Sequence, residues 1–174
     1  MKRRVNMKKI NIKISKRYLK DLIITIMLGI TLSTVILSFF RITTINGHSM
    51  DNTLYDGQRL ILSMKSYSFG KTPEYKDVIV FERKDLSTRY LVKRVIGVAG
   101  DRVAIKDNQL YINNKLINED YIKEPMNMDD LDIVVPEGKV FVMGDNRNNS
   151  IDSRKCIIGF VDIEDEICGK VLGV

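Results

Sequence analysis

One serine and one lysine have sequence surroundings that are compatible with covalent chemistry. Ser49 follows a loop glycine, Gly47, and glycine lets another chain approach the backbone closely. Lys93 and Arg94 lie in Tyr90–Gly97, whose other side chains are mostly apolar on both faces of a strand. Burial can lower a lysine pKa by up to about 3–5 units, so Lys93 can become neutral, whereas Arg94 stays charged and needs a carboxylate. A neutral amine can take the proton of a serine hydroxyl and activate it as a nucleophile.

A third segment, Met143–Arg154, is dense in hydrogen-bonding groups and follows a predicted strand. It offers carboxylates to Arg94 and a hydroxyl, Ser150, that could orient an amine. Each segment also has an ordinary alternative: a surface loop serine, an edge strand with both charges in water, and a polar turn enriched in asparagine. The sequence has no His/Cys cluster with metal-ligand spacing, so we expect no metal and no cofactor.

The segments that must position these side chains read mainly as β-strands. Short β-branched or aliphatic runs bounded by turn residues predict strands at residues 59–62, 77–81, 90–97, 103–105, 109–112, 115–117, 139–143 and 160–163. Asp107-Asn108 and Asn113-Asn114 separate three of these runs and predict two successive hairpins. Outside one apolar run, no long window shows helical periodicity. We therefore expect an antiparallel β domain built of small sheets.

The exception is an uncharged run of 19 residues, Leu22–Phe40. As a helix it is about 28 Å long, close to the thickness of the hydrocarbon core of a bilayer. A buried soluble helix is disfavoured because the run has no polar stripe. A cleaved signal peptide is disfavoured because the run exceeds the usual length of about 7–15 residues and ends in Phe39-Phe40-Arg41 rather than in small residues. The sequence predicts an uncleaved transmembrane helix at residues 22–40.

Charge is distributed unevenly on the two sides of this run. Residues 1–20 hold nine basic and no acidic side chains, whereas residues 41–174 hold 19 basic and 21 acidic ones. Because basic flanks stay in the cytoplasm, we expect a basic cytoplasmic tail at residues 1–21, in contact with membrane lipid. Residues 41–174 would then form the catalytic β domain outside the cell membrane. The nearly neutral charge of this domain argues against a nucleic-acid partner.

Together, and in this order behind an anchor, the three segments resemble the type I (leader) signal peptidases, a bacterial Ser-Lys dyad family. The family pattern is Ser-Met after the anchor, a Lys-Arg-Val-Ile-Gly strand and a Gly-Asp-Asn-Arg…Ser…Asp-Ser-Arg loop, and residues 20–174 carry it. The resemblance implies a mainly β, antiparallel signal-peptidase/LexA-like fold with one N-terminal transmembrane helix. It also implies a membrane-anchored serine endopeptidase that removes signal peptides from secretory preproteins, cutting after small residues of the Ala-X-Ala type.

The resemblance assigns roles to individual side chains. Ser49 would be the nucleophile and Lys93 the general base, with Ser150 orienting the lysine amine. The Ser49 backbone N–H, helped by Gly47, would stabilise the oxyanion. His48 is an alternative base, although in an extended chain it points away from Ser49. The residues expected to form supporting ion pairs are Arg94, Asp145, Asp152 and Arg154, and those expected to line small substrate pockets are Met50 and Leu54.

Several points stay open at the level of sequence. Asn52 and Ala99 stand where the family usually has proline, and their effect on loop rigidity and substrate range is not fixed. Cys156 and Cys168 could form a disulfide or stay free. The substrate set could be general or dedicated, and the secretion translocase could be a further partner. The alternative function is a non-catalytic, membrane-anchored assembly or chaperone module on the same fold, and the presence of both dyad residues argues against it.

Overall fold

The computed structural model describes residues 15–68, 70–84, 86 and 90–174, and the chain divides into two compact units at residues 37 and 38. The first unit is dominated by helix α1 (Lys16–Phe39), which has no buried residue and contains an 18-residue window with a mean hydropathy of 2.4. By length and composition this helix can cross a membrane. It begins before the predicted run, so part of the expected basic tail is helical, and residues 1–14 of that tail lie outside the described residues.

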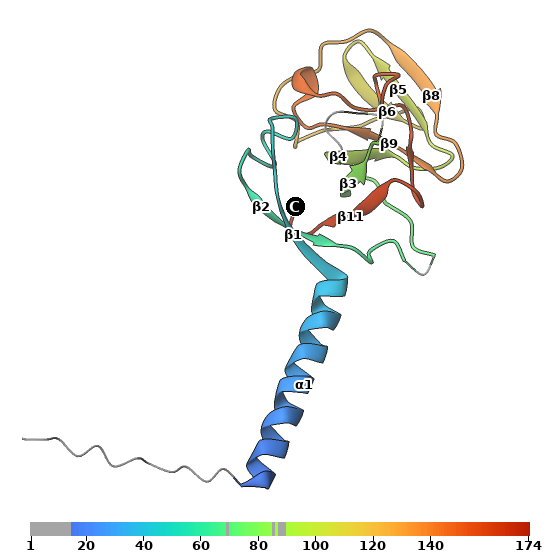
Figure 1. Cartoon of the computed structure of the whole chain (residues 1–174). Coiled ribbons are helices and arrows are strands. Elements are labelled where there is room, and N and C mark those ends of the chain that lie inside the picture. The colour runs from blue at the N-terminus through green and yellow to red at the C-terminus, as the bar shows by residue number, and fades with distance from the viewer. Residues whose placement is uncertain (1–14, 69, 85, 87–89) are drawn as a thin grey trace, which may run out of the picture. The chain divides into compact units, whose positions relative to one another are not determined.

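The second unit consists of β-strands joined by turns and by longer loops (Figure 1). Its strands are β1 (Phe40–Thr44), β2 (Arg59–Ser63), β3 (Val78–Glu82), β4 (Tyr90–Gly97), β5 (Arg102–Lys106), β6 (Gln109–Ile112), β7 (Lys115–Leu116), β8 (Leu131–Val134), β9 (Lys139–Met143), β10 (Val161–Asp162) and β11 (Ile167–Val171). One sheet has the order β1-β2-β11-β3-β4-β9-β10 and the other β7-β6-β5-β8. All the pairings in both sheets are antiparallel, as predicted.

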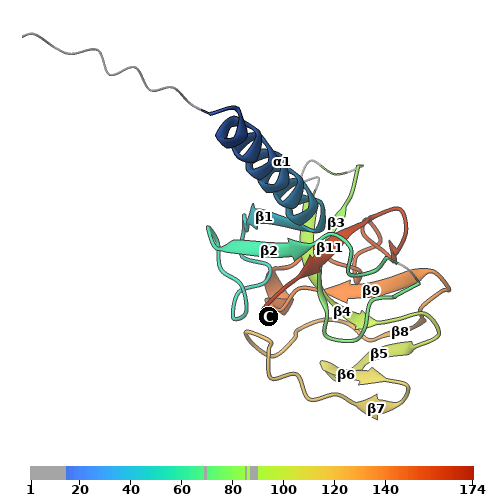
Figure 2. The same cartoon turned by 90° about the horizontal axis from the view of Figure 1, so that it is seen from below.

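The large sheet is covered on both faces, and this explains why its central strands are apolar on both sides. In β3, Val78 and Val80 pack into one hydrophobic cluster while Ile79 and Phe81 pack into another on the opposite face. The small sheet, whose strands lie side by side in Figure 2, closes a third cluster over Phe141 and neighbouring residues of β4 and β9. Strand β4 therefore lies in the interior, between β3 and β9, and does not expose its charged residues at an edge.

Most of the predicted strands are present, and the two predicted hairpins are confirmed. Strands β5, β6 and β7 pair in succession, and the Asn/Asp residues at both turns adopt the positive φ that such turns require. Three strands were not predicted: β1, which continues the apolar run of the helix, β8, and β11. The seven-stranded sheet is larger than the small sheets expected, because β11 enters between β2 and β3 and joins the two halves.

Candidate active site

The structure brings Ser49 and Lys93 into direct contact. Lys93 Nζ lies 2.7 Å from Ser49 Oγ, and a second hydrogen bond of 2.9 Å joins Nζ to the backbone oxygen of Val92. Ser49 belongs to the loop that follows β1, whereas Lys93 lies in the middle of β4. Two elements that are 44 residues apart in sequence thus place a hydroxyl within hydrogen-bonding distance of an amine.

The lysine amine is kept away from water. Lys93 is only 2% exposed, and this burial lowers the pKa of its amine to about 8 from an ordinary value of 10.5. The carboxylates of Asp152 and Asp145 oppose the effect in part by favouring the charged form. A substantial fraction of Lys93 is therefore neutral near physiological pH and able to accept a proton.

The loop that carries Ser49 is held by its own apolar side chains and by one asparagine. Met50 and Leu54, on either side of the turn after Ser49, are buried in the cluster beneath β2 and β3. Asn146 donates its backbone N–H to the Ser49 carbonyl oxygen at 3.1 Å and its side-chain amide to the His48 carbonyl oxygen at 2.9 Å. Two successive carbonyl groups of the loop are thus fixed by a single buried residue.

Gly144 lets the loop after β9 approach Ser49 closely. A Cβ atom at Gly144 would collide with the Ser49 carbonyl oxygen and with Oγ of Ser150. The position therefore needs glycine for steric reasons rather than for an unusual φ. Ser150 Oγ is itself buried and has no hydrogen-bond partner among the described residues. The hydrogen bonds of the Lys93 amine go to Ser49 and Val92, and the expected one with Ser150 is not among them.

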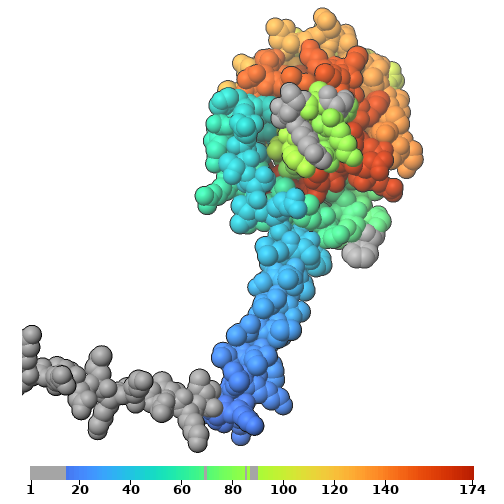
Figure 3. Space-filling view, viewed as in Figure 1, coloured from blue at the N-terminus to red at the C-terminus, as the bar shows by residue number. Residues whose placement is uncertain are grey.

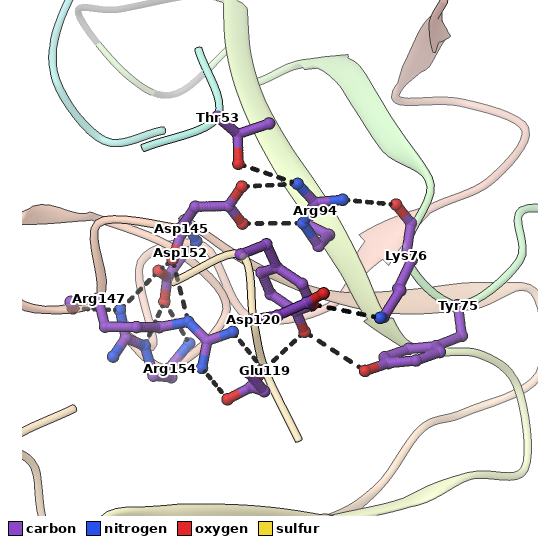
Figure 4. Close-up of polar contacts among 12 residues, drawn as sticks. Thr53, Tyr75, Lys76, Arg94, Glu119, Asp120, Asp145, Arg147, Asp152 and Arg154 are labelled. Carbon is purple, nitrogen blue, oxygen red and sulfur yellow. Dashed lines mark hydrogen bonds and ion pairs between the residues drawn. The ribbon is translucent and has the colours of Figure 1, made fainter. Parts of the chain in front are cut away.

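Next to the lysine, Arg94 is neutralised inside the domain. Its guanidinium donates two hydrogen bonds to the Asp145 carboxylate, at 2.9 and 2.7 Å, and a third to the Lys76 backbone oxygen at 2.9 Å. Figure 4 shows these contacts together with a longer one, of 3.3 Å, to the hydroxyl of Thr53. The buried arginine thus has the carboxylate that its burial demands.

A second pair closes the loop on itself. Arg154 donates to both carboxylate oxygens of Asp152 at 2.7 Å and to the backbone oxygen of Arg147 at 2.7 Å. Burial alone would raise the pKa of Asp152, but the hydrogen bonds from Arg154 and from the Gly144 N–H hold it below its usual range. Arg147 in turn forms a bidentate pair with Glu119. All four charged side chains of residues 143–154 are thus in ion pairs.

A groove of about 340 Å³ opens beside the two reactive groups. Its two sides are the end of β1 with the following loop and the first half of β4, and both lie on the face shown in Figure 3. The residues that line it include Thr43, Thr44, Ile45, Asn46, Gly47, Ser49, Met50, Val80, Tyr90, Leu91, Val92 and Lys93. Met50 thus lines the groove as expected from sequence, whereas Leu54 is buried in the core and does not.

The other residues singled out by sequence take different places. The Gly47 N–H is donated to Asp56 at 2.7 Å, so it shapes the loop and is not free for another acceptor. Among the described residues none accepts the Ser49 backbone N–H. His48 is exposed and contacts Asp51 rather than the hydroxyl of Ser49. Cys156 and Cys168 are both free thiols, so the disulfide left open by the sequence is not formed.

Sequence reasoning missed Asn146 and the Glu119–Arg147 pair. The asparagines of this chain carry little weight as a sequence signal because they are so frequent, yet Asn146 bridges to the loop that carries Ser49 across 98 residues. Glu119 lies in a polar segment without strand or helix periodicity, so only the fold reveals its contact with a fully buried arginine. Within the described ranges, no group of three or more His, Cys, Asp or Glu side chains could hold a metal ion.

Comparison with known proteins gives a consistent result. The sequence model of one family, described as signal peptidase, peptidase S26, matches residues 15–174. The chain is 38% identical over 176 residues to signal peptidase I U of Bacillus subtilis, covering 95% of this chain and 91% of that protein. It is 37% identical over 160 residues to signal peptidase I of Bacillus licheniformis, covering 84% and 83%. Signal peptidase IB of Staphylococcus aureus is 39% identical over 146 residues, covering 74% and 73%.

A solved structure agrees with the sequence relatives. A crystal structure of a signal peptidase I from Enterococcus faecalis superposes with a TM-score of 0.50 at 33% sequence identity. The match covers 57% of this chain and 97% of that one. The mainly antiparallel β architecture described above is therefore shared with a protein of the same family.

Proposed function

The chain belongs to the peptidase S26 family of signal peptidases, which remove signal peptides, and we propose that it does so with Ser49 as nucleophile and Lys93 as general base. The observation that carries this proposal is the 2.7 Å contact between Lys93 Nζ and Ser49 Oγ, made by a lysine with almost no exposed surface. Of the side chains near Ser49 Oγ, Lys93 supplies the amine at hydrogen-bonding distance, while His48 is turned to Asp51.

The reaction follows from this geometry. Neutral Lys93 accepts the Ser49 hydroxyl proton as Oγ attacks the carbonyl carbon of the scissile peptide bond. The oxyanion of the tetrahedral intermediate accepts a hydrogen bond from the Ser49 backbone N–H. This N–H has no partner among the described residues. Protonated Lys93 then gives its proton to the leaving amine, and the signal peptide remains as an ester on Ser49. Lys93 next takes a proton from the water that attacks this ester and gives it to Ser49 Oγ as the signal peptide leaves with a free carboxyl group, which restores the enzyme.

The groove supports binding of an extended substrate. β9 pairs with β4 from Arg94 onward, so residues 91–93 of β4 have, among the described residues, no sheet partner on the side of the groove. A substrate strand laid along this edge would gain backbone hydrogen bonds, and the pockets for its side chains would give selectivity. Met50 lines the groove, and we propose that its bulk favours small residues at the first and third positions before the cut. We propose cleavage after Ala-X-Ala-type sequences.

We further propose a single-pass arrangement in the cell membrane. Helix α1 would be the anchor, with the N-terminus in the cytoplasm and the β domain outside, because basic residues are concentrated before the helix. The basic residues would contact anionic lipid headgroups. Exported preproteins delivered by the secretion translocase would reach the groove from that outer side.

A cleavage assay tests the proposal. Full-length enzyme in detergent is incubated with a secretory precursor that carries an Ala-X-Ala site, and the mature product is quantified. Ser49→Ala and Lys93→Ala should each reduce cleavage to background, and Lys93→Arg should do the same because arginine keeps its proton. His48→Ala is the matched control and should cleave like the wild type. Substantial activity in Lys93→Arg would remove Lys93 as the base.

A further inference from the structure

Asn52, three residues after Ser49, has an unusual backbone conformation. Its φ is +91°, a region that glycine adopts freely and asparagine tolerates, but that costs other residues energy. Proline, which is usual here in the family that the sequence resembles, has φ fixed near −65° and cannot adopt this conformation. Such a conformation persists when surrounding contacts hold it in place. The turn after Ser49 is therefore held in a way that depends on the identity of residue 52.

The Asn52 side chain stabilises this conformation with two hydrogen bonds. Its Nδ2 donates to the backbone oxygen of Tyr121 at 3.1 Å and to that of Ile122 at 3.3 Å. Both acceptors are carbonyl groups, so the site requires an amide nitrogen and would repel a carboxylate. The preceding residue, Asp51, pairs with Lys123 Nζ at 3.0 Å. Two adjacent residues of the nucleophile loop are thus fastened to residues 121–123, here called the strap.

The strap also contacts β4, the strand that carries the proposed base Lys93. The backbone N–H of Lys123 donates to the backbone oxygen of Asp145 at 3.0 Å. The Tyr121 ring lies under the guanidinium of Arg94, with 4.4 Å between ring centre and the central guanidinium carbon. Arg94 neighbours Lys93 in β4 and pairs with Asp145 (Figure 4). A single segment of three residues therefore contacts the loop that carries the hydroxyl and the strand that carries the amine.

We infer that Asn52 is a positioning residue, which clasps the nucleophile loop to the strap and so sets the distance between Ser49 Oγ and Lys93 Nζ. This inference rests on the proposed Ser49–Lys93 function. Asn52 does not line the groove, so its effect falls on the chemical step rather than on substrate binding. A displacement of about 1 Å between reacting groups can cost roughly a hundredfold in rate. Loss of one of several fastenings should cost less, roughly tenfold in kcat.

Two substitutions separate the effect of the Asn52 side-chain hydrogen bonds from the effect of its backbone conformation. Asn52→Gly keeps the positive φ and removes the amide, whereas Asn52→Ala removes the amide and also strains the backbone. Full-length enzyme in detergent is assayed for kcat and KM on a precursor with an Ala-X-Ala site, with rates expressed per folded enzyme. We expect Asn52→Gly and Asn52→Ala to share a roughly tenfold lower kcat with KM unchanged. Asn52→Ala should in addition unfold at a lower temperature.

The control variant is Asn114→Gly. Asn114 is an exposed hairpin-turn residue with a φ of +66°, far from the site in the four-stranded sheet, and its substitution should leave kcat unchanged. A kcat of Asn52→Gly within twofold of the wild type would overturn the inference, as would a loss confined to KM. Ser49→Ala is assayed in parallel, so that a failure of the Asn52 inference can be distinguished from a failure of the proposed function. Background activity in Ser49→Ala with full activity in Asn52→Gly would contradict only the clasp, whereas activity in Ser49→Ala would contradict the proposed function itself.

Discussion

Arg94 and Asp145 meet in a bidentate ion pair in the interior of the β domain, with hydrogen bonds of 2.9 and 2.7 Å and no exposed surface on the carboxylate. The arginine follows Lys93 in β4, and the aspartate follows Gly144 in the loop that touches Ser49. The pair therefore joins the element of the amine to the loop beside the hydroxyl. The two charges are tolerated in the interior only as a pair, because either one left alone would be a buried, unpaired charge that destabilises the fold.

Removal of one member of this pair should destabilise the fold strongly. We expect Asp145→Ala to lower the free energy of unfolding by about 3–5 kcal/mol, because Arg94 remains buried and charged. Denaturant unfolding of the detergent-solubilised chain measures this. Asp132→Ala is the matched control, since it breaks an exposed bidentate pair with Arg102. Equal losses in the two variants would show that the burial of the Arg94–Asp145 pair has no energetic consequence.

A methyl group at Gly144 should disrupt the site without a change in charge. Gly144→Ala places a Cβ against the Ser49 carbonyl oxygen and the Ser150 hydroxyl, so the nucleophile loop must move. We expect cleavage to fall by roughly a hundredfold or more. Gly29→Ala is the control, because a Cβ at Gly29 in α1 meets no atom within 4 Å. Wild-type activity in Gly144→Ala would mean that the two loops do not need their close approach.

Burial of the Lys93 amine should lower the free energy of unfolding of the protein. Its folded-state pKa of about 8 lies below the unfolded value of 10.5, so between these pH values the unfolded chain binds more protons and stability rises with pH. Lys93→Met removes this penalty, and below pH 8 it should be more stable than the wild type by up to roughly 3 kcal/mol. The difference should shrink as pH rises toward 10.5. Unfolding measured at pH 7 and pH 10 checks this, and a gain that does not depend on pH would contradict it.

The groove predicts selectivity at the residue before the cut. A precursor series with Ala, Leu and Phe at that position should be cleaved in the order Ala, then Leu, then Phe. Overpacking of a small pocket costs about 1–3 kcal/mol, so Phe should reduce kcat/KM by roughly 10- to 100-fold. Equal cleavage of all three precursors would separate the chemistry of Ser49 and Lys93 from the proposed selectivity.

The sequence predicted the strand that carries Lys93 better than it predicted the surroundings of Ser49. Tyr90–Gly97 is largely apolar on both faces, and this pattern fits a strand that pairs with β3 over residues 90–94 and with β9 from Arg94 onward. The burial of Lys93 and Arg94 follows from the same pattern. The hairpins at Asn108 and Asn113 could be predicted because their turns are local and their residues favour positive φ.

Contacts between distant segments could not be predicted in this way. Asn146 reaches the nucleophile loop and Asn52 reaches the strap across 98 and 69 residues, and neither contact leaves a periodic signal. Because asparagine is frequent in this chain, the few asparagines that connect distant segments do not stand out in the sequence. Leu54 was expected in a substrate pocket because of its nearness to Ser49 in sequence, yet the turn after Ser49 directs it into the core. Strand β11 was missed because its pairing partners, β2 and β3, lie roughly a hundred residues earlier.

The pH dependence of the chemical step tests the central claim, that neutral Lys93 activates Ser49. Single-turnover cleavage with enzyme in excess is measured from pH 6 to 10. The rate should rise about tenfold per pH unit at low pH and level off above a midpoint near 8, because one proton must leave Lys93 before it can accept the Ser49 proton. A rate that is flat over this range, or that falls as pH rises through 8, would contradict the assignment of Lys93 as the base.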